Sequence, residues 1–542
     1  MSLRPLVRSF LAAALLLALS CGGASAQAGR QRAVGRDAPP PAQWNHEWAR
    51  GAVFYEIFVR SFADSDGDGI GDFDGLISRL DHLNDGDPAT TTDLGIDGIW
   101  LMPMFESTSY HGYDTEDYDT VERDYGTNAG FQRFLDEAHR RGIRVIVDLV
   151  LNHTSVEHPW FIESASSTAS PRRDWYVWSA TDPGWKQPWG GNDPSWHFRN
   201  GAWYYGAFWS GMPDVNFRNP DAKAEMFRVA RHWLGQGVDG YRLDATRYLV
   251  ETGPGEAGQA DTAETHQVLR ELSAEVRRIR PDAILVAENT VDAPALAKYF
   301  DSIPMNFNFP LSYAIVEGVK SGNAQRIHQT LSETIRLFPP GIIDTPFLTN
   351  HDQTRIATVL GNHPGKLRNA AAILLTLPGM PFIYYGEEVG LQNGPTPADE
   401  SKRTPMPWTA SGGFTTGTPW MAYAPGLAVN NVTSQSGDPE SLLSYYRNWI
   451  AARKRSDGLA KGDVRPLETG SQILTFVRDS GRERVLVAHN VSSAFAEAGP
   501  LDVSAAGFET VQADPGVPQP AGGPGAWRLS LPPNTSGAWR IR

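Results

Sequence analysis

Residues 144–153 are RVIVDLVLNH, a short apolar run that ends in polar residues. A run of this length and composition predicts a β-strand. Seven similar runs recur along the chain, at 53–58, 98–102, 240–243, 284–287, 303–306, 345–348 and 381–385. Helical patterns lie between several of them, for example at 129–141, 265–280 and 367–377. The alternation predicts parallel strands joined by helices, and eight such units predict an α/β chain built on a (β/α)₈ TIM barrel.

The chain is longer than eight such units require, and the surplus predicts further domains. The largest insertion follows the third strand, and we interpret residues 154–219 as a small subdomain on the rim of the barrel. From residue 459 the pattern changes to short alternating runs separated by Gly, Pro and Ser, which predicts a C-terminal antiparallel β-sandwich over 459–542. The barrel then comprises residues 48–153 and 220–458.

The N-terminal residues have the order of an export signal. Basic residues precede an apolar run at 10–19 and then small residues, so we predict a cleavable signal peptide over 1–26. Residues 27–47, rich in Ala, Gly, Arg and Pro, predict a linker. A secreted or periplasmic protein is therefore expected. Cys21 leaves an alternative open, because its neighbours resemble the lipid-attachment site of bacterial lipoproteins and would give a membrane-anchored form.

Composition and charge exclude several classes of partner. The 542 residues contain 48 Lys and Arg against 62 Asp and Glu, a formal net charge of −14. Nucleic acids and anionic membranes require a basic surface, so neither is expected as a partner. No stretch approaches the ~20 apolar residues that a transmembrane helix needs. A single cysteine excludes disulfide scaffolds and zinc fingers. We also expect a monomer.

Carboxylates follow several of the predicted strands. Asp244, Glu288 and Asp352 come after the fourth, fifth and seventh strands. Because the C-terminal ends of barrel strands meet on one face, we expect these side chains to converge on one cavity. Arg242 lies two residues before Asp244, on the same side of its strand, and can keep that carboxyl ionised. Each carboxylate alone fits a solvated loop or a helix cap, but together they favour an active site.

A second candidate site lies in the loop after the first strand. Asp64, Asp66, Asp68 and Asp72 occupy positions 1, 3, 5 and 9 of a glycine-rich turn, with the backbone carbonyl of Ile70 at position 7. This is the oxygen-ligand spacing that a hard cation such as Ca²⁺ requires. A merely solvated acidic turn is the alternative, and we predict a structural Ca²⁺.

The strand-end segments resemble the signature regions of the α-amylase family, glycoside hydrolase family 13, over residues 51–455, and the likeness extends to the insertion and the sandwich. The resemblance implies that Asp244 is the nucleophile, Glu288 the general acid/base, and Asp352 the carboxylate that orients the sugar at the scissile bond. The implied mechanism is double displacement through a covalent glycosyl-enzyme, with retention of configuration.

The same resemblance implies a set of substrate-binding residues. Arg242, His153 and His351 match residues that contact the sugar at the cleavage site or the nucleophile. Tyr113 matches the ring on which that sugar stacks. Arg403 lies in a segment close to one of the glucosidase and trehalose-synthase branches, and we expect it to contact substrate.

Substrate preference stays open at this point. The segment 212–216, Met-Pro-Asp-Val-Asn, is intermediate between the oligo-1,6-glucosidase and neopullulanase branches, and the 64–72 loop resembles the calcium loop of the former. We expect an exported α-amylase-type hydrolase that cleaves α-1,4 bonds in starch or maltooligosaccharides. The alternatives are an α-glucosidase or oligo-1,6-glucosidase, a transglycosylase or trehalose-forming isomerase, and, more remotely, a non-catalytic glucan-binding protein.

Overall fold

The computed structural model describes residues 43–542. The predicted signal peptide and Cys21 lie outside the described residues, as does most of the predicted linker. Residues 43–47, the last of that linker, contact the barrel, since the Asn45 amide donates a hydrogen bond to the Pro281 carbonyl at 2.6 Å. Within 43–542, no helix has both the length and the apolar character needed to cross a membrane.

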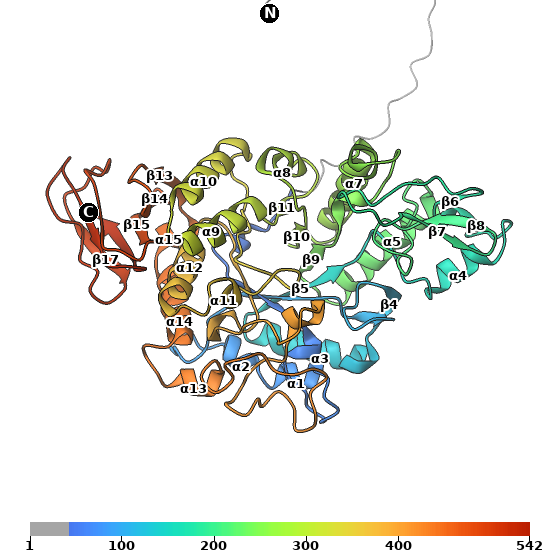
Figure 1. The fold of residues 1–542 in the computed structure, drawn as a ribbon, viewed down its shortest axis with the longest axis horizontal. Helices are drawn as coiled ribbons and strands as arrows, with labels where there is room; N and C mark the ends of the chain where they lie inside the picture. The colour runs from blue at the N-terminus through green and yellow to red at the C-terminus, as the bar shows by residue number, and fades with distance from the viewer. Residues whose placement is uncertain (1–42) are drawn as a thin grey trace, which may run out of the picture. The chain divides into compact units, whose positions relative to one another are not determined.

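Seven parallel strands form the central sheet. In spatial order they are β11 (Met305–Asn306), β10 (Ile284–Ala287), β9 (Gly240–Leu243), β5 (Arg144–Leu149), β2 (Gly98–Leu101), β1 (Phe54–Ile57) and β12 (Phe382–Tyr384). The segment 345–347 closes the ring, because Thr345 pairs with Phe307 and Phe347 pairs with Phe382. The predicted TIM barrel is therefore confirmed (Figure 1).

Two of the predicted strands are shorter than expected. The run 303–306 forms a strand only over Met305–Asn306, and the run 345–348 forms two isolated bridges. Each contains a proline, Pro304 and Pro346 respectively. Proline has no amide hydrogen to donate to a strand ladder, which limits regular pairing at these positions.

Helices cover the outside of the barrel, and capping side chains fix where several of them begin. Thr127 caps α3, Asn219 caps α5 and Thr262 caps α7, each by accepting a backbone amide of the first turn. The longer helices are α3 (Asn128–Arg140), α5 (Pro220–Gly235), α7 (Ala263–Ile279), α8 (Ala293–Tyr299), α9 (Phe309–Ser321), α10 (Gln325–Leu337), α12 (Pro364–Thr376) and α14 (Leu442–Arg455).

The barrel interior is filled by apolar side chains that point inward from several strands. Phe54, Trp100, Ile146, Val286 and Phe382 are all at most 2% exposed and form one cluster. A separate and larger cluster lies between the strands and the surrounding helices. The barrel is thus a packed core with no channel through it, so ligands must be bound at its ends.

The segment after β5, predicted as a small subdomain, contains a short sheet. It is antiparallel in the order β6 (Trp178–Ser179), β8 (Ala202–Tyr205) and β7 (Trp196–Arg199), and the helix α4 (Pro159–Ser166) precedes it. A two-stranded ribbon, β3 (Phe105–Ser107) and β4 (Thr115–Val121), follows β2. Short helices elsewhere are α1 (Phe73–Ile77), α2 (Leu80–Leu83), α6 (Glu256–Gln259), α11 (Ile356–Val359), α13 (Val432–Ser436) and α15 (Asp457–Lys461).

The C-terminal residues form two antiparallel sheets, as predicted for a sandwich. The larger has the order β13 (Asp463–Leu467), β14 (Ile473–Asp479), β15 (Arg484–Asn490), β19 (Ser536–Ile541) and β17 (Phe508–Ala513). The smaller pairs β16 (Ala496–Ala498) with β18 (Leu529–Leu531). Apolar side chains from both sheets share one cluster around Trp539, which is fully buried. The inserted and C-terminal sheets lie on different sides of the barrel strands in Figure 1.

Candidate active site

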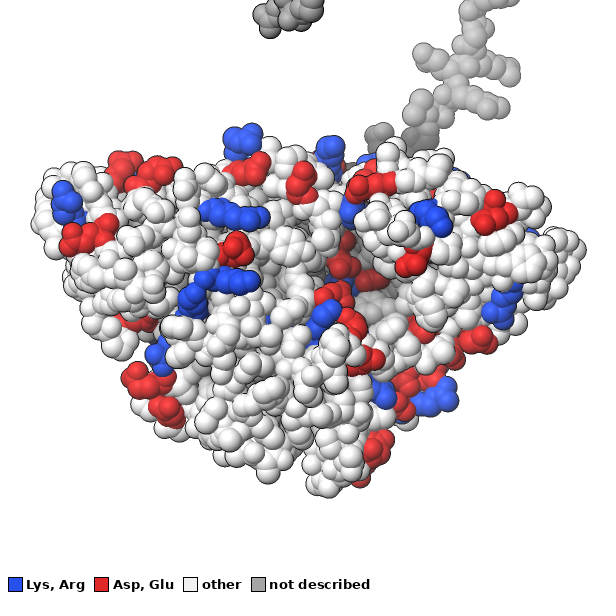
Figure 2. Space-filling view, viewed as in Figure 1, with Lys and Arg blue, Asp and Glu red and all other residues white. Residues whose placement is uncertain are grey.

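The three predicted carboxylates converge at the C-terminal ends of the strands. Asp244 directly follows β9, Glu288 directly follows β10, and Asp352 lies beyond the bridging segment 345–347. All three line one cavity of about 360 Å³, and Figure 2 shows acidic and basic atoms gathered in a hollow on this face. The other residues lining the cavity are His111, Tyr113, His153, Phe208, Met212, Ala245, Arg247, Tyr248, Thr290, Asp399 and Arg403.

Arg242 links the two carboxyl groups predicted to carry the chemistry. Its Nη1 lies 2.6 Å from Oδ1 of Asp244, and its Nη2 lies 2.8 Å from Oε2 of Glu288. Nη1 also donates to both carboxylate oxygens of Asp148, at 2.9 and 3.0 Å. Arg242 is fully buried, so the guanidinium group is held rigidly between these three carboxyl groups.

The environment of Glu288 suits a proton donor. Burial raises its pKa, the Arg242 charge opposes that rise, and the Asp244 and Asp352 charges add to it, with a result of about 7. Burial is therefore the first cause of the raised pKa, ahead of the neighbouring carboxylates. Ala245, in the left-handed conformation at φ 50°, directs its amide to Oε2 of Glu288 at 3.3 Å. A non-glycine residue in this conformation next to reacting groups is a mark of a functional site.

His351 is held from both sides. Its Nδ1 lies 2.6 Å from Oε1 of Glu56, and its Nε2 lies 2.6 Å from the Tyr113 hydroxyl and 3.2 Å from Oδ2 of Asp352. Burial alone would lower the pKa of His351, but the Asp352 and Glu56 charges outweigh burial and raise it to about 9. The imidazole is therefore a cation at neutral pH, beneath the cavity floor.

Asp352 faces the cavity with a half-exposed carboxyl group. Arg403 binds it, with Nη2 to Oδ1 at 3.0 Å, and also binds Asp399 at 2.8 Å and the Tyr110 hydroxyl at 3.0 Å. Burial would raise the pKa of Asp352, but the His351, Arg403 and Arg242 charges hold it well below its usual range. Asp352 is thus ionised throughout the working range of pH.

The remaining predicted residues also lie at the cavity. Tyr113 donates through its hydroxyl to Asp148 at 3.1 Å, and its ring is nearly parallel to that of His351. His153 lies 3.1 Å from the Tyr113 carbonyl through Nε2, and burial lowers the pKa of its imidazole, which is therefore neutral. All eight residues predicted for catalysis and substrate binding thus belong to one connected cluster. Arg242 and His351 are its fully buried members.

Four members of this cluster were not predicted. Asp148 pairs in register with Arg242 across β5 and β9, and Glu56 lies on β1 within an otherwise apolar run. A charged residue inside a buried strand is a signal that could have identified both. Tyr110 and Asp399 are 289 residues apart and meet only in the fold, so sequence reasoning offered no signal for that pair.

The inserted segment places aromatic residues near the cavity. Of its eight tryptophans, Trp160 and Trp196 are buried, whereas Trp189 and Trp209 are 46% and 49% exposed. Trp189 packs against two residues of the cavity lining, with ring centroids 5.1 Å from Phe208 and 5.6 Å from Tyr248. An aromatic surface therefore borders the carboxylates on this side.

The acidic loop after β1 brings three of its predicted ligands together. One oxygen each from Asp64, Asp66 and Asp72 lies within 4.8 Å of the others. Two oxygens on opposite sides of a Ca²⁺ ion are about 4.8 Å apart, so the donor set and its spacing fit such a cation. Asp68 lies outside this group, and its carboxylate accepts the Ile70 amide at 2.7 Å.

Backbone geometry explains the glycines of this loop. Gly69 has φ +96°, and a Cβ there would lie 2.1 Å from the Thr418 carbonyl oxygen. Only glycine allows the loop to pack this closely against the segment around Thr418. Asp72 also caps α1 by accepting the Gly75 amide, which ties the acidic loop to the first helix.

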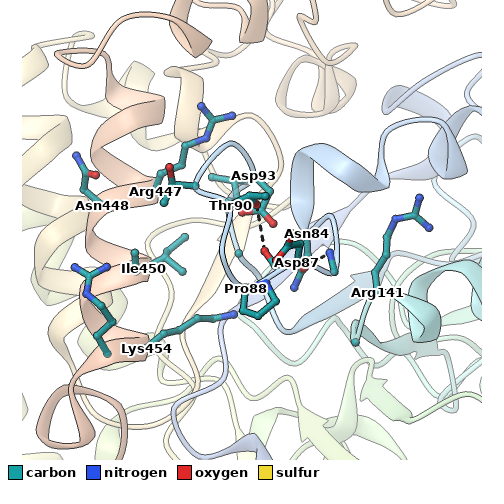
Figure 3. A pocket seen from close by; sticks show the side chains of 17 residues that line it. Asn84, Asp87, Pro88, Thr90, Asp93, Arg141, Arg447, Asn448, Ile450 and Lys454 are labelled. Atoms are coloured by element: carbon teal, nitrogen blue, oxygen red, sulfur yellow. Dashed lines mark hydrogen bonds between the residues drawn. The ribbon is translucent and has the colours of Figure 1, made fainter.

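A larger cavity, of about 550 Å³, lies away from this site (Figure 3). It is lined by the loop 84–95, which leads into β2, by Arg141 before β5, and by one face of α14. These residues precede their strands, so the cavity lies at the N-terminal end of the barrel. Its charged groups include Arg447, Lys454, Asp87 and Asp93, and no fully buried arginine among its lining residues joins two carboxyl groups as Arg242 does at the other end.

Comparison with known proteins agrees with this geometry. The family model described as the α-amylase catalytic domain matches residues 56–462. Alpha-amylase 3 of Dictyoglomus thermophilum is 38% identical over 455 residues, covering 83% of this chain and 86% of that protein. Trehalose synthase of Pimelobacter sp. is 33% identical over 551 residues, covering 90% of this chain and 94% of that protein.

Solved structures give the same result. The crystal structure of the α-amylase from H. orenii matches with a TM-score of 0.82 and 36% identity, covering 91% of this chain and all of that one. The fold and these relatives show an α-glucan-active enzyme. The chain belongs to the α-amylase family of glycoside hydrolases and transglycosidases.

Proposed function

We propose that this protein is a retaining α-amylase-type hydrolase that cleaves α-1,4-glucosidic bonds of starch or maltooligosaccharides. The observation that carries the proposal is the single guanidinium group of Arg242, which contacts both Asp244 and Glu288. Retaining enzymes need their two carboxyl groups about 5–5.5 Å apart, whereas inverting enzymes need about 6.5–9.5 Å. Two carboxyl groups that share one guanidinium favour the closer arrangement.

The proposed roles follow from the charge state of each group. Asp244 attacks the anomeric carbon and forms the new C–O bond, while protonated Glu288 gives its proton to the leaving oxygen as the glycosidic bond breaks. Ionised Glu288 then takes a proton from water, which attacks the anomeric carbon and releases Asp244. Asp352, Arg403 and the His351 cation orient the sugar at the cleavage site.

The relatives keep transglycosylation open as a second candidate. A trehalose synthase matches 90% of this chain, and an enzyme of that kind passes a glucosyl group to a sugar acceptor instead of water. The same proposed intermediate on Asp244 serves both outcomes, so the acceptor decides between them. Product analysis therefore has to separate the two.

The test is a digest of maltoheptaose and of starch with the wild-type chain, with products separated by chromatography. An α-amylase yields new reducing ends and a range of shorter maltooligosaccharides with the α-anomer formed first. Release of glucose alone from the chain end indicates an α-glucosidase. Trehalose or longer oligosaccharides indicate transfer. If neither substrate changes, the proposal is wrong.

We also propose that the acidic loop binds a structural Ca²⁺ through Asp64, Asp66 and Asp72, which is supported by their mutual distances. The cation would neutralise carboxylates that otherwise repel one another and would thereby stabilise the loop. Export to the periplasm or the medium remains our proposal from the N-terminal sequence. Detection of the mature chain in a periplasmic extract or culture supernatant, with its N-terminus read by mass spectrometry, tests it and separates cleavage near residue 26 from lipidation at Cys21.

A further inference from the structure

A second cavity flanks the carboxylate site, on the side of α9. Its volume is about 370 Å³, and it is lined by Tyr313, Val316, Glu317, Arg326, Leu348, Thr349, Gln353, Thr354 and Val359. Gln353 is the neighbour of Asp352 in the chain, so the wall of this cavity continues directly from the active-site cavity. Neither the family match nor the roles argued above assign it a ligand.

The cavity has one exposed aromatic wall. The Tyr313 side chain, on α9, is 45% exposed, and Leu348 is buried at the cavity floor. Burial raises the pKa of the Tyr313 hydroxyl, the neighbouring Gln353 side chain opposes that rise, and the charges of Glu288 and Asp352 add to it. The phenol ring therefore stands within electrostatic reach of two of the proposed reacting and orienting groups. A single exposed ring is ordinary at a protein surface.

The Gln353 side-chain amide distinguishes this cavity from an ordinary surface hollow. Its Oε1 and Nε2 are both shielded from solvent, and within residues 43–542 neither has a hydrogen-bond partner of standard geometry, although the amide lies close to the Tyr313 hydroxyl. Buried amide groups are nearly always hydrogen-bonded, and one left unpaired costs free energy. The amide offers an acceptor and two donors at a cavity wall, which is the complement of a ligand rich in hydroxyl groups.

The charged residues of the cavity also suit a ligand rich in hydroxyl groups. Glu317 and Arg326 line it, and neither forms an ion pair among the described residues. A carboxylate and a guanidinium group can each bind two adjacent hydroxyl groups. The cavity thus offers the Tyr313 ring to C–H groups, an apolar floor, and polar side chains that can bind hydroxyl groups. This combination fits a pyranose ring better than a purely apolar or an anionic ligand.

We propose that the cavity between Tyr313 and Gln353 is a glucan-binding subsite that holds a glucose unit of a long substrate beyond those bound at the carboxylates. This inference rests on the proposed α-glucan hydrolysis and adds a chain-length preference to it. Substrates too short to reach Tyr313 lose this contact, whereas maltoheptaose and starch retain it.

The experiment measures kcat/KM for maltotriose and maltoheptaose with the wild type and with Tyr313→Ala, Tyr313→Phe and Gln353→Ala. We expect Tyr313→Ala to lower kcat/KM about tenfold more for maltoheptaose than for maltotriose, equivalent to about 1.4 kcal/mol. Tyr313→Phe keeps the ring and should retain most of the preference. Phe495→Ala is the matched control, because Phe495 is a 58% exposed aromatic residue that lines none of the cavities described above.

If Tyr313→Ala lowers kcat/KM equally for maltotriose and maltoheptaose, or lowers neither, the proposed subsite is refuted. Thermal unfolding of each variant shows whether a loss reflects damage to the fold. If the wild type hydrolyses neither substrate, the proposed function fails and the subsite is still tested, by calorimetric titration with maltoheptaose. Binding that is weakened about tenfold by Tyr313→Ala supports the subsite, and unchanged or absent binding refutes it.

Discussion

Replacement of Glu288 by Gln tests the proposed acid directly, because it keeps the size of the side chain and removes the titrating proton. The pKa of Glu288 is raised from 4.5 to about 7, first by burial and then by the Asp244 and Asp352 charges, against the opposing Arg242 charge. At about 1.36 kcal/mol per pH unit, the site disfavours the ionised form by on the order of 3 kcal/mol. At pH 7 about half of the molecules hold the proton, against about 0.3% for an ordinary glutamate.

The assay is the pH dependence of kcat/KM for maltoheptaose. The wild type should lose activity as pH rises through about 7, because the acid must be protonated for the first step. Glu288→Gln should lower kcat/KM by about 10²–10⁴ and abolish this alkaline limb. For a substrate with a 4-nitrophenolate leaving group, which needs little protonation, Glu288→Gln should lower kcat/KM much less.

Glu387→Gln is the matched control. Burial raises the pKa of Glu387 to about 8, but its carboxylate binds the Tyr446 hydroxyl at 2.7 Å and does not line the active-site cavity. The control should therefore keep the alkaline limb. The reasoning is refuted if Glu288→Gln retains that limb, or if the wild-type limb lies below about pH 5.5.

Stability gives a second readout of the same group. Since the folded-state pKa of Glu288 is raised, its contribution to stability is fully present below about pH 4.5 and is lost as pH rises through about 7. The Gln variant cannot ionise, so its melting temperature relative to the wild type should increase between pH 5 and pH 8. A constant difference across this range would contradict the raised pKa.

Three further outcomes follow from the site and the loop. Asp244→Asn should leave less than about a hundredth of the wild-type turnover while maltoheptaose binding, measured by calorimetry, persists; greater residual turnover excludes Asp244 as the nucleophile. Chelation by EDTA should lower the melting temperature of the wild type but not that of Asp66→Asn. Purified wild type that contains no bound calcium would count against the proposed site. Asp148→Asn frees Arg242 to stabilise ionised Glu288, so the alkaline limb should move about one unit to lower pH; an unmoved limb would show that the two carboxyl groups are not coupled through Arg242.

Much of the fold could be predicted because each barrel strand is a short apolar run that the helical segments separate. The exceptions are informative. The runs at 303–306 and 345–348 have the right composition, but Pro304 and Pro346 cannot donate to a ladder, so regular pairing is reduced there. Local composition predicts that a strand exists, whereas hydrogen-bonding capacity decides its length.

The site was predictable to the extent that barrel geometry makes strand ends converge. Asp244, Glu288 and Asp352 were identified by this rule alone, without any knowledge of their contacts. Asp148 and Glu56 were missed because their roles depend on which strands are neighbours and in what register, which a single sequence does not specify. Register places Asp148 beside Arg242, and pairing of β1 with β12 and β2 sets Glu56 inside the barrel near His351.

Those missed residues explain why the proposed acid is protonated. Six carboxyl groups are linked by shared cations here: Glu56, Asp148, Asp244, Glu288, Asp352 and Asp399. The cations that bind them are four: Arg242, His351, Arg403 and Lys402. Two carboxyl groups are therefore left without a compensating charge, and a buried site with low solvent access disfavours such an excess. The two whose pKa is raised to about 7 are Asp148 and Glu288, with burial as the first cause for each. Glu288 thus holds a proton because it is buried and the cations are too few for all six groups, while Asp352, bound by both His351 and Arg403, remains ionised. The division of roles between the acid and the orienting carboxylate is set by how the cations are shared, which follows from strand register and the burial of Arg242.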